Sequence, residues 1–256
     1  MRTYLLERSR LVFQSDVERN FHIFYQLFAG LSPQEREQLQ LNRASDFAYL
    51  QSDARTETPA PDLTDDEQFQ ATRRALSTIN IDLTTQQSIF RLLAAILHLG
   101  NIKVVQARGS ADIDASDRAL RMASHLLGIA SDDLRRWMIK KQISARSERI
   151  IMSLNATQSA SVRDSIAKFI YSRMFDWLIT IVNDSLAGDE GLGPLMAESF
   201  IGILDIYGFE YYPDVAMTKT GKRGRLVNSF EQFCINYANE RLQHEVRTRP
   251  STTYAS

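Results

Sequence analysis

Apolar residues recur three and four positions apart over most of the chain, which is the spacing of a helix with one buried face. Phe21, Phe24 and Phe28 follow this spacing, and Gly30 then predicts the helix end. The longest stripe predicts a helix from Thr157 to about Leu186. Further helices are predicted to begin near Ser32-Pro33, at a cap on Thr84 or Thr85, at Ser131 and at Asn228-Ser229, and to end at Gly100, Gly128 and Met138.

Few segments have the pattern of strands. Residues 4–13 and 102–105 could be extended, and FIGILDI at 200–206 is a short apolar run typical of a strand buried on both faces. Residues 139–152 alternate loosely and carry several basic residues, which predicts a hairpin or protruding loop. The expected fold class is therefore α/β and rich in helices. Its few strands could only complete a sheet whose other strands come from sequence outside these residues.

Composition narrows the class of protein. Among 256 residues, 44% are hydrophobic and 24% charged, and the formal net charge is -1, so no global attraction to nucleic acid or to an anionic membrane is expected. Neither a signal peptide nor a membrane-length apolar run occurs. The single cysteine, Cys234, excludes a disulfide within the chain and favours a reducing, cytoplasmic setting. The four histidines lack metal-ligand spacing.

The motif DIYGFE directly follows the predicted buried strand. Asp205, at the carboxyl end of that strand, could hold a water of a magnesium ion. Gly208 has no Cβ, so its backbone N–H could approach a phosphate oxygen, and Glu210 could pair with a cation. The spacing alone is equally compatible with an ordinary turn at a strand end, just as the basic residues of 139–152 alone are compatible with a solvated charge cluster.

Longer stretches around these motifs resemble the myosin motor domain. IGILDIYGFE is similar to the second switch and NSFEQFCINYANERLQ to the relay helix, while RTYLLERSRLVFQ, ERNFHIFYQLFAG, IFRLLAAILHLGNIK and VRDSIAKFIYSRMFDWLI are similar to the upper 50-kilodalton region. The likeness covers about 2–213 and 228–245 and is to fungal myosins of class V. It implies an internal fragment of a P-loop-type motor with an incomplete sheet.

The resemblance also implies a division of the chain. Residues 2–199 would be upper 50-kilodalton-like, 200–210 the strand and second switch, and 228–245 the start of the relay helix. Residues 211–227 and 246–256 are an atypical insert and an atypical tail, and we hypothesise that 214–227 and 246–256 are retained introns.

By the same resemblance, individual residues receive roles. Asp205 would lie in the second shell of Mg²⁺, Gly208 would sense the γ-phosphate of ATP, and Glu210 would bind an arginine of the first switch and help to position the attacking water. Residues in 139–152 would contact actin filaments, with Glu148 as an acidic residue that tunes binding. The expected actin-binding residues are Lys140, Lys141, Arg146, Glu148 and Arg149.

No G-x-x-x-x-G-K-[ST] motif occurs in these 256 residues. We therefore expect part of an actin-based motor of the cytoplasmic actin cytoskeleton, which uses ATP and Mg²⁺ when complete and binds light chains or calmodulin through a lever arm outside this chain. The chain alone is not expected to hydrolyse ATP or to fold completely. The alternatives are a non-catalytic actin-binding fragment and a myosin-like domain fused to another enzyme, such as a chitin synthase.

Overall fold

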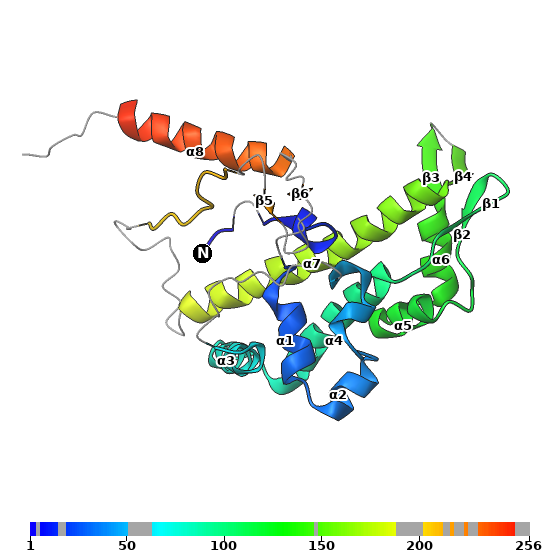
Figure 1. Ribbon diagram of the computed structural model, residues 1–256, viewed down its shortest axis with the longest axis horizontal. Helices are drawn as coiled ribbons and strands as arrows, with labels where there is room; N and C mark the ends of the chain where they lie inside the picture. The colour runs from blue at the N-terminus through cyan, green and yellow to red at the C-terminus, as the bar shows by residue number, and fades with distance from the viewer. Residues whose placement is uncertain are drawn as a thin grey trace, which may run out of the picture.

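The protein is built mainly of helices, as the hydrophobic pattern predicts (Figure 1). The computed structural model describes residues 1–256 except 4–5, 15–18, 51–62, 146–147, 188–201, 212–215, 218–222, 225–229 and 249–256. The helices are α1 (His22–Gly30), α2 (Pro33–Gln38), α3 (Asp65–Thr78), α4 (Leu83–Gly100), α5 (Arg118–Leu127), α6 (Ser131–Ile139), α7 (Ala156–Ala187) and α8 (Phe230–Thr248), with 3-10 turns η1 (Arg8–Leu11), η2 (Ala44–Asp46) and η3 (Ala48–Leu50).

The strands of the described residues form three separate antiparallel pairs. They are β1 (Val105–Ala107) with β2 (Ser110–Asp112), β3 (Lys140–Ala145) with β4 (Glu148–Ser153), and β5 (Ala216–Met217) with β6 (Arg223–Gly224). The helix-rich class and the predicted hairpin are confirmed, whereas the P-loop-type sheet remains a prediction. Residues 8–11 are a 3-10 turn instead of a strand, and the predicted strand 102–105 lies slightly later, at β1.

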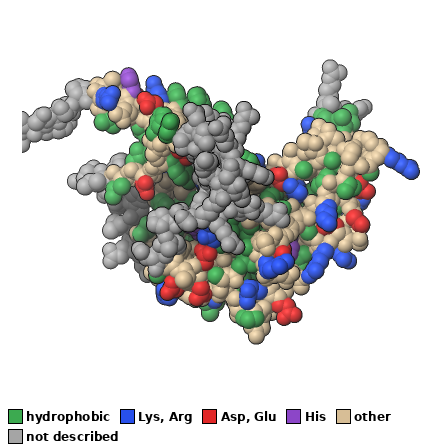
Figure 2. Space-filling view, viewed as in Figure 1, with side chains coloured by type: hydrophobic (Ala, Val, Ile, Leu, Met, Phe, Trp, Pro, Cys, Tyr) green, Lys and Arg blue, Asp and Glu red, His purple; other side chains and the backbone are tan. Residues whose placement is uncertain are grey.

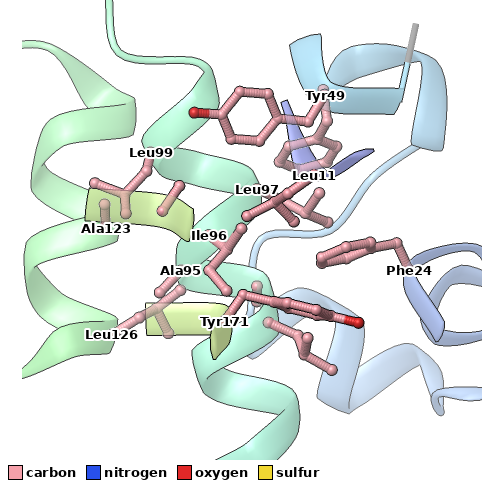
Figure 3. Packing of buried hydrophobic residues seen from close by; sticks show 14 of the residues in the cluster. Leu11, Phe24, Tyr49, Ala95, Ile96, Leu97, Leu99, Ala123, Leu126 and Tyr171 are labelled. Atoms are coloured by element: carbon pink, nitrogen blue, oxygen red, sulfur yellow. The ribbon is translucent and has the colours of Figure 1, made fainter. Parts of the chain in front are cut away.

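Helix α4 is the centre of the hydrophobic core. All its residues from Leu93 to Gly100 are buried, so its second half is enclosed on every side. Helices α5 and α7 contact α4 directly, and α1 packs with α3 beside them. Figure 3 shows side chains of α1, α4, α5 and α7 meeting, with Tyr171 of α7 between α4 and Phe24. Among the described residues, the core therefore lies mainly around a single helix.

A buried polar network fixes α7 against the turn η3. The Tyr49 hydroxyl donates a hydrogen bond to Asp164 Oδ1 at 2.7 Å, and Arg163 Nε donates to the same oxygen at 2.9 Å. Arg163 also donates to the backbone oxygen of Ile102 at 3.2 Å. Burial and the Asp164 carboxylate both raise the pKa of Tyr49, so this hydroxyl stays protonated as the donor. The network sets the position of α7 in a way that apolar contacts alone cannot.

Local capping decides where several helices begin and end. Asp82, not Thr84 or Thr85, caps α4, because its Oδ1 accepts the Thr85 N–H at 2.7 Å. Gly128 ends α5 with φ 69°, a left-handed conformation that glycine adopts without strain. The predicted cap at 228–229 lies outside the described part of the chain.

We expect His98 to make the stability of the chain dependent on pH. Its side chain is 7% exposed, and its Nε2 donates to the Leu39 backbone oxygen at 2.9 Å. Burial lowers its pKa in the folded protein, whereas the unfolded value is about 6.5. Because the unfolded chain then binds more protons, the free energy of unfolding should fall as pH drops below about 6.5, by up to about 1.4 kcal/mol per pH unit.

Urea unfolding between pH 5 and pH 8 measures this slope. His98→Gln should flatten it, because the amide can still donate to Leu39 but does not titrate. His125→Gln, at an exposed position of α5, is the matched control and should leave the slope unchanged. An equal slope in the His98→Gln variant would show that other groups carry the pH dependence.

Candidate functional site

The segment from Gly202 to Tyr211, which contains DIYGFE, has no regular secondary structure and lies on the surface. Ile203 is 94% exposed and Leu204 is 62% exposed. The prediction of a strand buried on both faces at 200–206 is therefore wrong for its described part. The physical reason is that no strand pairs with this segment among the described residues, so neither its backbone nor its apolar side chains are covered.

Three amide side chains of α8 hold this segment by its backbone. Asn236 Oδ1 accepts the Glu210 N–H at 2.7 Å, and Asn236 Nδ2 donates to the Glu210 backbone oxygen at 2.9 Å. Gln232 donates to the same oxygen at 3.3 Å, and Asn239 donates to the Tyr207 oxygen at 2.7 Å. Residues 232, 236 and 239 share one helical face, so the segment and α8 form one hydrogen-bonded unit.

The residues predicted to meet a nucleotide lie on the open side of this unit. Asp205 and Gly208 are both exposed, and Glu210 is half-buried. A Cβ built on Gly208 would meet no atom within 4 Å, and the backbone there is not left-handed, so neither packing nor conformation requires glycine. The exposed Asp205 carboxylate and the open approach to the Gly208 backbone N–H could form one side of a site for magnesium and phosphate. No basic phosphate cradle accompanies them in this sequence.

Tyr207 connects the segment to the helical body. Partial burial, followed by the Glu7 carboxylate, raises the pKa of Tyr207, and Tyr207 in turn contributes to the raised pKa of Tyr171 on α7. Tyr207 therefore lies near Glu7, which precedes η1, and near Tyr171 of α7, while side chains of α8 hold the backbone of the segment.

Helix α8 exposes its aromatic residues and buries part of its amide face. Phe230, Phe233 and Tyr237 stack on one another, with centroids 6.3 Å and 6.1 Å apart, but are 58–75% exposed. The buried residues are Gln232 and Ile235. The amides that hold the segment were missed, although their i, i+4, i+7 spacing was a readable signal. Among the described residues nothing covers the aromatic face, so those rings contact each other instead.

The second candidate site is the hairpin β3–β4, which stands away from the body (Figure 1). Its base is anchored by the bonds from Leu154 N–H to Ile139 O at 2.9 Å and from Ala111 N–H to Leu154 O at 2.6 Å. Figure 1 places the hairpin and α8 on opposite sides of the molecule, with α7 running between them. A long, rigid helix therefore separates the two candidate sites.

Basic and apolar side chains share both faces of the hairpin. Lys141 lies opposite Met152, and the next inward pair on the same face is Ile143 with Ile150. The described members of the predicted basic set, Lys140, Lys141 and Arg149, are all exposed, as are Ile150, Ile151 and Met152. Basic side chains are visible on this side of the molecule in Figure 2. Arg146 lies outside the described residues, and Glu148 is described only by its backbone, at the start of β4.

Within the described ranges, no three His, Cys, Asp or Glu side chains gather in a group that could hold a metal ion. None of the described helices combines the length and the apolar character needed to cross a membrane.

Comparison with known proteins places the chain in a family. Residues 1–249 match the model of the myosin head (motor domain). The chain is 47% identical over 245 residues to Myosin-2 of Saccharomyces uvarum and 46% identical over 245 residues to Myosin-2 of Saccharomyces cerevisiae. In both cases 96% of this chain aligns with only 14% of the relative.

Myosin-52 of Schizosaccharomyces pombe is 46% identical over 247 residues, again covering 96% of this chain and 15% of the relative. The chain thus spans about one seventh of the length of these fungal relatives, and it is the helical body, the hairpin and the DIYGFE segment together that match. The chain belongs to the myosin head (motor domain) family.

Proposed function

We propose that this chain is the part of an actin-based motor that joins an actin-contacting hairpin to a segment that senses the phosphate of ATP. The observation that carries the proposal is the bonding of residues 207–210 to α8 through three side-chain amides. A segment held in this way cannot move without the helix. If a γ-phosphate attracts the Gly208 amide, the displacement is transmitted to α8.

On the nucleotide side, the roles follow the chemistry of each group. Asp205 would hold a water of Mg²⁺, the Gly208 N–H would donate to a γ-phosphate oxygen, and Glu210 would position water. ATP with Mg²⁺ would supply the phosphoryl group and the charge that draws the segment inward. Because no phosphate cradle occurs in this sequence, we infer that turnover requires parts of the motor beyond these residues.

On the actin side, the hairpin would offer both charge and apolar surface. Lys140, Lys141 and Arg149 are free to meet acidic groups, and Ile150 and Met152 can bury apolar area next to them. Arg146 and the acidic Glu148 would complete the contact at the tip. Binding of light chains or calmodulin, the class V assignment and a location on the cytoplasmic actin cytoskeleton stay predictions that follow from the family.

The two alternative functions predict different results for binding to actin filaments with and without ATP. A non-catalytic actin-binding fragment would pellet with actin filaments equally with and without ATP, whereas a complete motor that contains this sequence would be released by ATP. A myosin-like domain that is fused to another enzyme and no longer acts as a motor would not pellet with actin filaments in either condition. Cosedimentation with actin, at equal ionic strength, separates these cases.

We expect Asn236→Ala to loosen residues 207–210 without unfolding the body. The variant removes the two bonds that Asn236 makes to Glu210 and keeps the one from Gln232, so the Glu210 amide should exchange its hydrogen up to about tenfold faster, since one hydrogen bond contributes about 1 kcal/mol. Hydrogen exchange resolved by mass spectrometry or NMR measures this. Glu240→Ala, at an exposed position of α8, should not alter it. An unchanged Glu210 rate in Asn236→Ala would argue against the hydrogen-bonded unit.

We expect Gly208→Ala to lower ATP turnover while it leaves the stability of the fold nearly unchanged. The structure has room for the methyl group, so the free energy of unfolding should change by no more than about 1 kcal/mol. In a complete motor carrying this sequence, ATP turnover should fall by about a hundredfold or more, because the methyl group keeps the phosphate from the amide. Thermal unfolding and steady-state ATPase assays measure the two effects. Normal turnover in a folded variant would remove Gly208 from the nucleotide site.

We expect the double variant Lys140→Glu, Lys141→Glu to weaken actin binding about tenfold or more at low salt, because two attractions become repulsions. Cosedimentation over a range of salt measures it, and the difference should shrink as salt rises. Arg74→Glu with Arg91→Glu makes the same charge change at exposed positions of α3 and α4 and is the control. Equal losses in both variants would indicate a general charge effect.

A further inference from the structure

An apolar cavity lies between α1, α3, α4 and α7, and Tyr171, the neighbour of Tyr207, forms part of its wall. Its volume is about 280 Å³. None of its lining residues carries a charge, and four of them are aromatic, including Phe90 and Trp177. The aliphatic wall is formed chiefly by Ile23, Leu76, Ile89, Leu93 and Leu178.

The size and chemistry of the cavity suit a small aromatic molecule. A cavity of about 150 Å³ lined by apolar side chains stays dry and accepts benzene, and this one is nearly twice as large. Ligand pockets are typically apolar with a few polar groups that fix orientation. A charged ligand is disfavoured, because no lining residue could compensate for its lost hydration.

The polar group that would orient a ligand is Gln26, which is only 7% exposed. Its Nε2 donates to Gln68 Oε1 at 3.1 Å. Its Oε1 has only a 3.4 Å contact with the Thr72 hydroxyl, whose single proton has a closer acceptor, the Gln68 backbone oxygen at 3.0 Å. The Gln26 carbonyl oxygen therefore makes one long hydrogen bond among the described residues, and an amide oxygen can accept a second.

We propose that this cavity binds a neutral, two-ring aromatic molecule whose single N–H or O–H group donates a hydrogen bond to Gln26 Oε1. The rings fill the space between Leu93, Leu178 and the aromatic side chains, and the donor satisfies the buried amide oxygen. A molecule in this position contacts four helices of the body at once, so its binding stabilises the folded chain. The proposal is independent of ATP and of actin.

Titration calorimetry of the full 256-residue chain with indole and with benzofuran tests this site. The two probes have nearly the same shape, but benzofuran has a ring oxygen where indole has the N–H. Indole should bind at one site, and benzofuran should bind about three- to tenfold more weakly, as expected for one hydrogen bond. Equal affinities, or no binding of indole, would overturn the proposal.

Two variants locate the binding. Gln26→Met keeps the size of the side chain but removes the acceptor, so indole should bind no better than benzofuran, while benzofuran binds as before. Ile89→Trp fills the cavity from a half-buried position and should abolish binding of both probes while circular dichroism shows an intact helical body. If Ile89→Trp fails to fold, Leu76→Phe replaces it. A retained preference for indole in Gln26→Met, or retained binding in a folded, filled variant, would place the probe elsewhere.

Discussion

The enclosure of α4 is the constraint on which the rest of the molecule depends. From Leu93 to Gly100 this helix exposes almost nothing to water, so α1, α5 and α7 must all pack against it or beside it. Gly100 allows a close approach, because a Cβ there would lie 2.8 Å from the Tyr49 ring. The ring of Tyr49 can then reach α7 with its hydroxyl, and that bond to Asp164 sets the position of the longest helix.

Helix α7 in turn separates two surfaces with different physical character. At one side, the hairpin β3–β4 is anchored at its base and exposes basic and apolar side chains, which suits contact with a large acidic partner. At the other, residues 202–211 are bonded through their backbone to α8, which leaves Asp205 and Gly208 open. The proposed function depends on both surfaces, because the hairpin offers the contact surface and the segment is bonded to a helix that would move with it.

Many of the exposed apolar residues lie in residues 202–211 and in α8. Ile203, Leu204 and Phe209 are largely exposed, and so are the stacked rings of Phe230 and Phe233. Single exposed apolar residues are ordinary, but several of them on one segment and on one helix face are typical of an interface. The chain spans only about one seventh of the length of its relatives.

The amino-acid sequence by itself determined the helices and the main motifs. Three-four spacing located α1, α4, α5 and α7, and the alternating basic stretch located the hairpin, because both signals depend only on neighbouring residues. The family was also readable from the motifs around DIYGFE.

Only the tertiary structure decided what depends on distant partners. A run such as FIGILDI is buried only where other strands flank it, and the inward face of α8 depends on which surface it meets, here the backbone at Glu210 and not an apolar core. The cavity beside Gln26 likewise arises from how four helices fit together, which no local pattern records. The spacing of neighbouring residues specifies each helix or strand, but which of its residues are buried depends on the elements that pack against it.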